Sequence, residues 1–493
     1  MSTANSDVYD VVIVGAGISG INTAYRLQSE LPGITYTILD ARAAIGGTWD
    51  FFKYPGLRSD SDLFTFGFQW RPWSEKRAVA DGQSILSYIR ASATAEGIDR
   101  RIHFNSRVQT ADWSSKSQNW TLAVNSNNTI KQVLTKFLVF GSGYYDYEQA
   151  LPAVIPGLSS FNGRIIHPQF WPDDLDYTDK RIVVIGSGAT AVTLLPTLAK
   201  KAAIVTMLQR SPTYILALPN PASGSLLQKF LPEYLSFKLS RIYFLVLPMM
   251  FYYFCRIFPK AAKNFLRNGA ASHLPKGYPV DPDFTPSYKP FDQRVCFAPD
   301  GDFYAAIRNG RAKVMTGTIK NVVDDSIVLN NGQKIDADII VTATGLKLRW
   351  GGGVKMSVDK QPYLAGDKFT WNHAMLQDLP NCAFVIGYSN ASWTLGADAT
   401  ALLLCRILKG VHKHGLTSII PKIPNEPMKA IPILSLNSTY VRAAREDMPR
   451  AGDVGPWRRR TTYFNDMFKV KYCNVTQGLE TYQGDTLVTG ITF

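Results

Sequence analysis

The sequence predicts an α/β protein with two domains of the same kind and a helical insertion in the second domain. Three observations lead to this prediction. The chain has 493 residues, which exceeds the size at which one hydrophobic core usually continues to grow. A pattern of buried strand, glycine-rich turn, helix and second strand begins at residue 11 and returns at residue 182. From about residue 219 to 290 the strand pattern is lost, and prolines and aromatic residues are frequent.

The first repeat opens with the apolar run 11–14, which is typical of a strand buried on both faces of a parallel sheet. A helical pattern and a second strand, 36–39, follow, and this strand ends at Asp40. Three glycines allow a tight turn, close approach of the backbone to a pyrophosphate and close packing of helix on strand: Gly15, Gly17 and Gly20. Asp40 stands where an acid binds ribose hydroxyls, so a Rossmann-like domain that binds FAD is predicted.

The second repeat has the same order but a different ending. Its strand, 182–185, leads into a turn whose three positions hold Gly186, Gly188 and Ala191. The next strand ends at Arg210, beside Ser211, where the first repeat has an acid. A carboxylate would repel a 2′-phosphate, whereas a guanidinium forms a charge-assisted fork with it. We therefore predict a second Rossmann-like domain that binds NADPH in preference to NADH, the alternative for Arg210 being a solvated surface arginine.

The turns between these patterns indicate the domain boundaries. The apolar run 137–140 is typical of a closing strand, and prolines with a glycine mark a linker at about 152–157. Strand patterns resume near residue 314, and the C-terminal third is expected to return to the first domain. The predicted order is the first FAD part, the linker with the first NADP part, the helical insertion, the second NADP part and the second FAD part, at residues 1–148, 149–217, 218–296, 297–348 and 349–493.

Composition and charge exclude several classes of protein. Apolar residues make up 46% and charged residues 19% of the chain, which is far from the composition of disordered proteins. The net charge of +14 favours anionic partners, but the basic residues are spread along the chain apart from 458–460. Because no nucleic-acid-binding motif accompanies them, no nucleic-acid partner is predicted.

The cysteines and the N-terminus bear on redox chemistry and location. The five cysteines form no Cys-x-x-Cys pair, which argues against a zinc site, a disulfide framework and a redox dithiol. No metal is predicted. Residues 1–10 lack the pattern of a secretion signal, so a cytoplasmic location is expected, at most peripheral to the membrane.

Two longer motifs indicate the kind of flavoprotein. Residues 161–172 have the form F-x-G-x-x-x-H-x-x-x-W-P, and residues 46–60 the form G-G-x-W-x-x-x-x-Y-P-G-x-x-x-D. Both resemble fingerprints of the type I Baeyer–Villiger monooxygenases, and 206–214 with 292–294 are similar to the bacterial ethionamide-activating group. The resemblance covers nearly the whole chain. It implies an enzyme that uses FAD, NADPH and O₂ to convert a ketone into an ester or lactone by way of a C4a-peroxyflavin.

The resemblance also implies the residues of the site. Asp60 and Arg294 correspond to an Asp and an Arg on the nicotinamide side of the flavin, where a guanidinium can stabilise a peroxide and an oxyanion. Asp60 would orient Arg294 and contact the carboxamide of NADP. The structural alternatives are a turn residue for Asp60 and a surface ion pair for Arg294. Cofactor contacts are expected from Gly47, Thr48 and Trp49.

One residue departs from the pattern of many family members. Gln293 stands where they have a Lys that helps to bind the 2′-phosphate. The ethionamide-activating group shares this Gln, so the departure places the chain within the family. The predicted preference for NADPH therefore depends mainly on Arg210.

Three ring side chains lie in or near the motifs, and two of them have two interpretations each. His167 lies in the linker, where a hydrogen-bonded hinge residue is favoured over a proton carrier. Trp171 is expected to pack beside it. Trp457 is assigned to cofactor binding as an aromatic residue on a mobile loop that closes over NADP, and core packing is the alternative.

The insertion contains an apolar stretch of 14 residues, 242–255, interrupted by Pro248. On these grounds it is expected not to span a bilayer as a helix. Basic residues flank it, as on a helix that rests on a membrane surface: Lys238, Arg241, Arg256, Lys260 and Lys263. The sequence favours the other interpretation, an aromatic-rich wall of the substrate pocket or a subdomain core. Both imply lipophilic substrates, and no oligomeric state is predicted.

Three functions stay open at this point. The first is oxidation of a ketone, with sulfide or thioamide oxidation as a side activity. The second is a monooxygenase that acts mainly on sulfides, thioamides or amines. The third is an NADPH oxidase that has lost oxygenation, against which Asp60, Trp171 and Arg294 argue.

Overall fold

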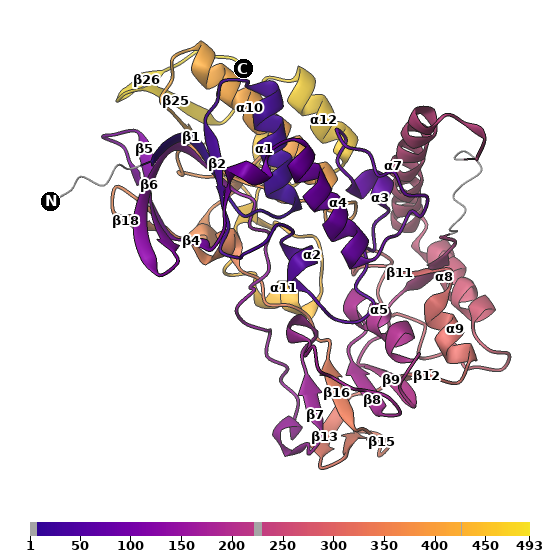
Figure 1. Ribbon diagram of the computed structural model, residues 1–493. Coiled ribbons are helices and arrows are strands. Elements are labelled where there is room, and N and C mark those ends of the chain that lie inside the picture. The colour runs from indigo at the N-terminus through magenta and orange to yellow at the C-terminus, as the bar shows by residue number, and fades with distance from the viewer. Residues whose placement is uncertain (1–6, 221–228, 425) are drawn as a thin grey trace.

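The computed structural model describes residues 7–220, 229–424 and 426–493. It contains two α/β units, the first in the upper part of Figure 1 and the second in the lower part. The predicted α/β class with two Rossmann-like domains is therefore confirmed. One part of the predicted helical insertion, 221–228, lies outside the described residues.

The first unit is built on a mixed sheet, to which 11 strands belong among the described residues. Its path is β18-β17-β4-β5-β6-β1-β2-β3, and β21 joins it beside β6. The strand β1 (Asp7–Val14) lies parallel to both β2 and β6. The other strands are β2 (Tyr36–Leu39), β3 (Ile102–His103), β4 (Ser106–Ser114), β5 (Asn119–Ser126), β6 (Thr129–Phe140), β17 (Lys355–Val358), β18 (Gln361–Tyr363), β19 (Thr370–Trp371), β20 (Met375–Leu376) and β21 (Cys382–Phe384).

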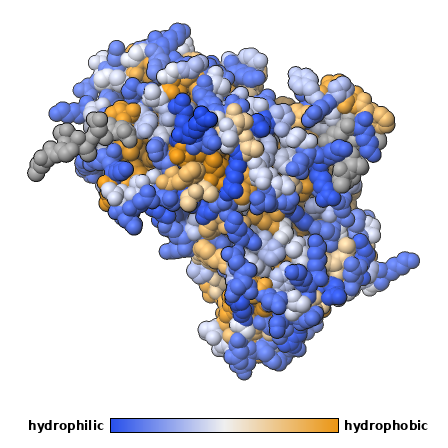
Figure 2. Space-filling view, viewed as in Figure 1, coloured by the Kyte–Doolittle hydropathy of each residue, from blue (hydrophilic) through white to orange (hydrophobic). Residues whose placement is uncertain are grey.

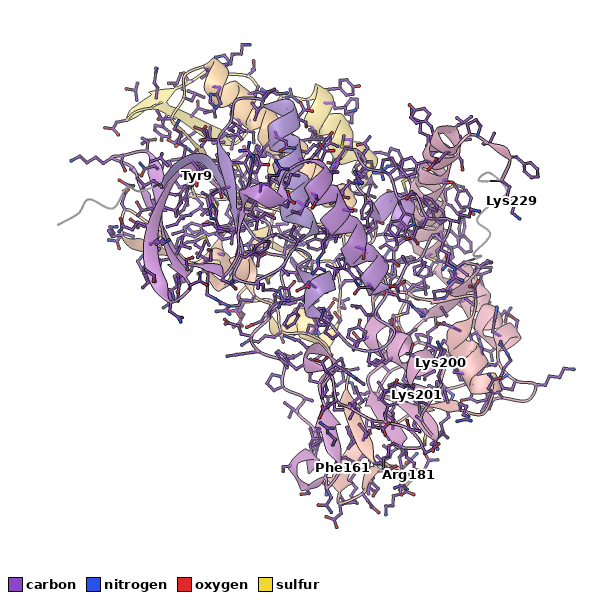
Figure 3. The ribbon with its side chains drawn as sticks, viewed as in Figure 1. Tyr9, Phe161, Arg181, Lys200, Lys201 and Lys229 are labelled. Atoms are coloured by element: carbon purple, nitrogen blue, oxygen red, sulfur yellow. The ribbon has the colours of Figure 1, made fainter. Side chains whose placement is uncertain are left out.

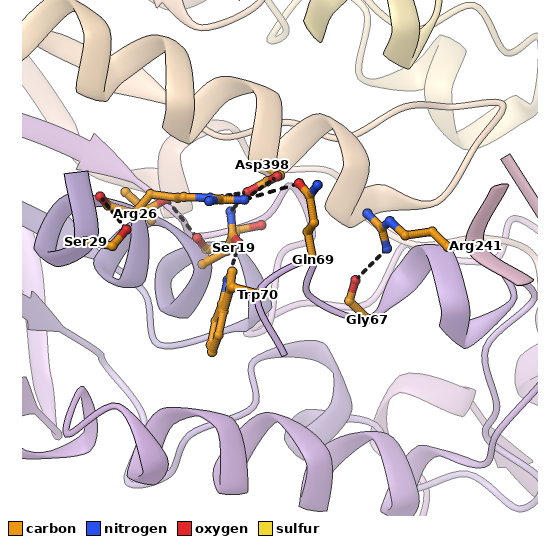
Figure 4. A network of polar contacts seen from close by, with 10 residues as sticks. Ser19, Arg26, Ser29, Gly67, Gln69, Trp70, Arg241 and Asp398 are labelled. Atoms are coloured by element: carbon orange, nitrogen blue, oxygen red, sulfur yellow. Dashed lines mark hydrogen bonds and ion pairs between the residues drawn. The ribbon is translucent and has the colours of Figure 1, made fainter. Parts of the chain in front are cut away.

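The C-terminal part of the chain completes this first unit. The strand β17 pairs with β4, and β21 pairs with β6. The long helix α10 (Trp393–Lys413) packs on α1 (Ile18–Glu30), where Arg26 donates to both carboxylate oxygens of Asp398 at 2.7 and 2.9 Å. Figure 4 shows this pair within a polar network that includes Trp70. Because the ion pair is largely buried and bidentate, it fixes α10 against α1, the helix that follows the first glycine-rich turn.

The second unit has a five-stranded parallel sheet in the order β12-β9-β8-β16-β7. Successive residues of a strand point to opposite faces, and β8 (Arg181–Ile185) follows this rule. Ile182 and Val184 pack with the helical side, while Val183 and Ile185 pack against the small antiparallel sheet β13-β14-β15. The sheet is thus covered on both faces, which explains the unbroken apolar runs of its strands.

The remaining elements of the second unit surround this sheet. Its strands are β7 (Arg164–Ile166), β9 (Ile204–Gln209), β10 (Ile215–Leu218), β11 (Cys296–Pro299), β12 (Ala312–Thr316), β13 (Ile319–Val323), β14 (Ser326–Leu329), β15 (Lys334–Asp336) and β16 (Ile339–Thr342). Its helices are α5 (Ala189–Leu198) and α9 (Asp302–Arg308). Elsewhere lie α2 (Thr48–Phe51), α3 (Leu63–Phe66), α4 (Gly82–Ala95), α11 (Thr439–Ala443), α12 (Tyr463–Tyr472), β22 (Ser418–Pro421), β23 (Ile431–Pro432), β24 (Arg450–Ala451), β25 (Leu479–Gln483) and β26 (Thr486–Val488).

In the described part of the insertion, two helices have defined bounds between β10 and β11, namely α7 (Glu233–Ile257) and α8 (Pro259–His273). The prediction that Pro248 interrupts the apolar stretch is wrong, because α7 continues through it for 25 residues. A proline inside a helix leaves one carbonyl without its partner and costs about 3 kcal/mol. Pro248 is exposed, so water can reach this carbonyl, and stacking of Phe244 on Phe64 holds the helix in place.

The length of α7 corrects two further expectations. By length and composition, α7 is apolar enough to cross a membrane, contrary to the sequence prediction for 242–255. Only 11% of its most apolar 18-residue window is buried, so it is not the core of a subdomain. No residue of α7 lines the cavity described below, so in the described part of the chain it is not a pocket wall either.

Candidate active site

The first cradle is the turn between β1 and α1, and its glycines are required by close packing. Gly15 has a φ of +106°, which favours glycine, and a Cβ on it would lie 2.9 Å from the carbonyl oxygen of Gly141. A Cβ on Gly20 would lie 1.9 Å from the carbonyl oxygen of Gly15. Gly17 is the N-cap of α1 and offers no side chain to the free N–H groups of the first turn. These N–H groups are therefore available to an anion.

Asp40 follows β2 and is held by the backbone of the same cradle. Its Oδ2 accepts from the backbone N–H of Ala16 at 2.5 Å, and its Oδ1 accepts from that of Arg42 at 2.7 Å. Burial raises the pKa of Asp40, although these two hydrogen bonds partly oppose the shift. The carboxylate is thus fixed at the edge of the cavity, where its remaining lone pairs can accept hydroxyl groups.

A cavity of about 360 Å³ begins at this cradle and extends to the second unit. At the far end it reaches the first turn of α5, through Ala189, Thr190 and Thr193. It brings together most of the residues that the sequence assigns to the first cofactor and to catalysis, namely Gly15, Gly17, Asp40, Gly47, Thr48, Trp49, Asp60 and Arg294. One continuous site therefore spans both units.

Asp60 and Arg294 both line this cavity. Burial raises the pKa of Asp60, and the guanidinium groups of Arg294 and Arg58 partly oppose this shift. Burial alone would lower the pKa of Arg294, but Tyr144 and Asp60 reverse the effect and raise it. Arg294 is exposed, and its side chain lines the cavity. The two charges affect each other's pKa without forming an ion pair, so both side chains stay available to a ligand in the cavity that they line.

Tyrosines surround Arg294, and the sequence interpretation missed them. Tyr144 and Tyr145 line the cavity, and their hydroxyl oxygens are 3.1 Å apart. The pKa of Tyr440 is raised to about 12, chiefly by burial. A signal for the first two was present, because they follow β6 directly and ligand crevices lie outside the carboxyl ends of parallel strands.

The loop that carries Asp60 also contacts the second unit. Arg58 forms an ion pair with Asp302 at the start of α9. Gly56 has a φ of +80°, and a Cβ on it would lie 2.3 Å from Oγ1 of Thr197 and 3.0 Å from the carbonyl oxygen of Thr193, both on α5. Asp60 is therefore positioned by both units at once.

The second cradle lies between β8 and α5. Gly186 has a φ of +129°, and a Cβ on it would lie 2.2 Å from the carbonyl oxygen of Ala343. Gly188 is the N-cap of α5, and a Cβ there would meet nothing within 4 Å, so the space in front of this helix is open. Ala191, which replaces the third glycine, is fully buried with its methyl in the core of this unit.

The residues after β9 lie on the surface beside this cradle. Arg210 is exposed, and its Nη2 donates to Oγ1 of Thr439 at 3.2 Å. The carbonyl oxygen of Ser211 accepts from the hydroxyl of Ser187 at 3.0 Å. Neither residue lines the cavity that holds Asp60 and Arg294. The sequence-predicted residues therefore fall into two groups. One group lines the cavity with Asp60 and Arg294, and the other, with Arg210 and Ser211, lies outside it beside the second cradle.

His167 has the contacts of a hinge residue. Its Nδ1 accepts from the backbone N–H of Gln169 at 3.2 Å, and its Nε2 lies 3.3 Å from the carbonyl oxygen of Gly345. Burial lowers its pKa. Both ring nitrogens are engaged with the backbone of segments that connect the two units, in agreement with the hinge interpretation. Trp171 packs against the core of the second unit.

Trp457 does not lie on an open loop. Only 2% of it is exposed, and it packs in the core of the first unit, in the same cluster as Trp371. It is not among the residues that line the cavity. The structure thus favours core packing, the alternative interpretation, over a lid above NADP.

The chain matches known proteins over nearly its whole length. Residues 75–223 match the family described as flavin-binding monooxygenase-like, and residues 13–79 match an NAD(P)-binding Rossmann-like domain. The FAD-containing monooxygenase EthA of Mycolicibacterium smegmatis is 44% identical over 95% of this chain and 96% of its own length. The chain belongs to the flavin-binding monooxygenase family. Another member, the probable FAD-binding monooxygenase AlmA of Acinetobacter baylyi, is 40% identical over 95% of both chains.

Solved structures resemble this flavin-binding monooxygenase in fold. OTEMO in complex with FAD and NADP superimposes with a TM-score of 0.73 at 19% identity, and covers 97% of this chain and 100% of its own. Oxidized steroid monooxygenase bound to NADP gives 0.72 at 21% identity over the same shares. Cyclohexanone monooxygenase with bound ε-caprolactone gives 0.73 at 18% identity, again over 97% and 100%. These matches agree with the predicted cofactors, FAD and NADP.

Proposed function

We propose that this flavin-binding monooxygenase inserts one oxygen atom next to the carbonyl group of lipophilic ketones, a Baeyer–Villiger oxidation that yields esters or lactones. The observation that carries the proposal is the pair Asp60 and Arg294, which face the same cavity beside the first cradle without forming an ion pair. Apolar side chains line the cavity around them, among them Phe52, Leu57, Phe66 and Leu346. The solved neighbours support it, because one of them is cyclohexanone monooxygenase with a bound lactone.

The two cradles divide the cofactors between them. The first cradle would hold FAD, with the pyrophosphate at the N-terminus of α1 and the adenosine ribose at Asp40. The second would hold NADPH at the N-terminus of α5, where the open space before Gly188 admits a pyrophosphate. FAD supplies the chemistry of oxygen activation once NADPH has reduced it. The protein has to position both cofactors and the substrate, and to exclude water.

Arg294 has the clearest role among the residues of this chain. When oxygen is added to a ketone, negative charge develops on the carbonyl oxygen, and a fixed guanidinium stabilises it most in a site shielded from water. The pKa of Arg294 is raised by Tyr144 and Asp60 against the effect of burial, so this group stays charged throughout the working range of pH. Asp60 would orient the guanidinium across the cavity.

The proposed function is tested by the products. Purified protein with bound FAD is incubated with NADPH and, in separate reactions, a linear ketone, a cyclic ketone, an aryl ketone and an aryl sulfide. Mass spectrometry should find ester or lactone 16 Da heavier than each accepted ketone. Sulfoxide as the main product, with no ester from any ketone, would replace the proposal by heteroatom oxidation. Hydrogen peroxide in an amount equal to the NADPH consumed would indicate an oxidase.

The preference for NADPH is expected to depend on Arg210. Arg210→Ala removes a guanidinium from the surface beside the second cradle, so the NADPH KM should rise by roughly tenfold to a hundredfold, the scale of one charge-assisted contact. The NADH KM should stay the same, because NADH has no 2′-phosphate. Initial rates with both cofactors measure the difference, and Arg100→Ala, an exposed arginine of the first unit, is the control. An equal loss with both cofactors would contradict the assignment.

A further inference from the structure

The helix α7 has the reverse of the usual surface pattern. Its polar side chains Ser236, Ser240 and Arg241 are buried against the first unit. Its outward side chains are large and apolar, and they form the apolar stripe, which consists of Leu235, Leu239, Ile242, Tyr243, Leu247, Met250, Tyr253 and Ile257. Of these, Met250 is 60% exposed and Ile257 is 64% exposed. Soluble monomers rarely leave such a continuous apolar surface uncovered.

The apolar stripe is one face of one helix. Apart from the adjacent pair Ile242 and Tyr243, its members follow one another at spacings of three or four residues, which places them on the same side of α7. Phe258 and Phe265, both more than half exposed, extend it onto the start of α8. Figure 1 shows α7 at the right-hand margin of the first unit, and Figure 2 shows hydrophobic residues at the upper right of the molecule.

The charge around the apolar stripe is strongly positive. Residues 229–267 contain seven Lys or Arg and one acidic residue, Glu233. Of the seven, three arginines are buried or paired with an Asp elsewhere, and the other four are lysines. Lys229, Lys238 and Lys260 are exposed, and Figure 3 shows Lys229 on the margin of the molecule near α7. An apolar face bordered by lysines is complementary to a bilayer whose headgroups carry negative charge.

We propose that the apolar stripe docks this protein on the surface of an anionic lipid bilayer, with α7 lying in the plane of the interface. Its apolar side chains would enter the boundary between headgroups and acyl chains. The bordering lysines would meet the phosphate groups of the lipids. This inference does not depend on which substrate the enzyme oxidises.

The inner face of α7 argues for lying on the bilayer rather than crossing it. Arg241 donates through Nη1 to the carbonyl oxygen of Phe64 at 2.6 Å, and Figure 4 shows its contact with Gly67. Towards the other end of the helix, Arg256 forms an ion pair with Asp292 at 2.7 Å. A spanning helix would have to leave these partners and carry Arg241 into the hydrocarbon, which is strongly unfavourable.

The same contacts place the docking surface next to the active site. The helix α3, on which α7 packs, begins three residues after Asp60, and Asp292 lies two residues before Arg294. The surface proposed to meet the bilayer is therefore attached to both segments that carry the candidate catalytic pair.

A second copy of this chain is the other occupant that an apolar helix face could accept. The charge argues against it, because two copies would bring the same lysine-rich borders together. Like charges across an interface disfavour association. Lipid phosphates relieve this repulsion, whereas a second copy increases it.

The test is flotation of the purified, FAD-loaded protein with lipid vesicles. Vesicles with equal parts of phosphatidylglycerol and phosphatidylcholine should carry the protein to the top of the gradient, and vesicles of phosphatidylcholine alone should carry far less. Met250→Glu combined with Ile257→Glu should reduce the floated fraction by roughly tenfold or more, because charge replaces two inserted side chains. Lys229→Ser combined with Lys260→Ser should remove most of the preference for phosphatidylglycerol.

The matched control is Val154→Glu combined with Ile130→Glu, which changes two exposed apolar residues away from α7 and should float like the wild type. All variants should keep FAD and elute as folded protein. Equal flotation of the stripe variant and the wild type would overturn the proposal, as would a wild type that does not float with anionic vesicles. A dimer that the stripe variant dissociates, without lipid binding, would assign the surface to a second copy. Retention in membranes after alkaline carbonate washing would indicate a spanning helix instead.

Discussion

Replacing Arg294 with Ala is expected to abolish ester formation while FAD binding, reduction by NADPH and oxygen consumption continue. The guanidinium lines the same cavity as Asp60, so its loss removes a fixed positive charge from the proposed site of oxygen transfer. One missing electrostatic partner in an active site costs about 4 kcal/mol of transition-state stabilisation, which corresponds to about a thousandfold in rate. NADPH consumption and ester yield are measured side by side, and their ratio gives the fraction of consumed NADPH that leads to ester.

Arg294→Lys is the informative companion, because it keeps the charge but loses the planar fork of donors. Arg294→Lys should recover part of the ester yield if the positive charge at position 294 stabilises oxygen transfer. An Arg294→Ala variant with normal ester yield would contradict the proposed role. A variant that simply loses FAD would show that Arg294 acts in folding or cofactor retention instead.

Replacing Gly20 with Ala should have a comparably large effect on a different property, the binding of FAD. The added Cβ would lie 1.9 Å from the carbonyl oxygen of Gly15, which is backbone and cannot turn away as a side chain can. The helix α1 would have to move off β1, which we expect to cost on the order of 3 kcal/mol and to distort the phosphate cradle. The flavin-to-protein absorbance ratio and the unfolding temperature should both fall.

Gly33→Ala provides the control for this change. A Cβ at Gly33 would meet nothing within 4 Å, so the variant should stay within about 0.5 kcal/mol of the wild type and keep its flavin. If Gly20→Ala also retained full flavin content and stability, close packing of α1 on β1 would not explain the glycine at position 20.

The parts of this molecule that are predictable from sequence are those that local chemistry determines. A φ above +100° combined with a carbonyl oxygen within 3 Å of the would-be Cβ requires glycine, so Gly15 and Gly186 mark both cradles in the amino-acid sequence itself. Buried parallel strands need apolar residues on both faces, which makes β1 and β8 recognisable. The placement of Asp60 and Arg294 in one cavity follows only from the family resemblance, because 233 intervening positions separate them in the chain.

What could not be predicted depends on contacts between distant segments. A proline such as Pro248 ordinarily ends a helix, yet α7 continues through it and packs on distant residues, as Phe244 does on Phe64. Trp457 looked like a loop residue because its neighbours are Gly and Pro, yet it fills a core that the N-terminal and C-terminal parts of the chain build together. The residues that surround Pro248 and Trp457 in the folded chain cannot be predicted from the residues next to them in the sequence.

The contact of Gly56 with α5 has a consequence for the width of the active site. Because Gly56 has no side chain, its backbone packs closely against the carbonyl oxygen of Thr193 and the side chain of Thr197. Even a methyl group there would act as a spacer and move the loop of Asp60 away from the second unit, although Gly56 itself does not line the cavity. The glycine of the Tyr-Pro-Gly motif thus sets the distance between the loop of Asp60 and α5, and with it the width of the cavity that would hold the cofactors.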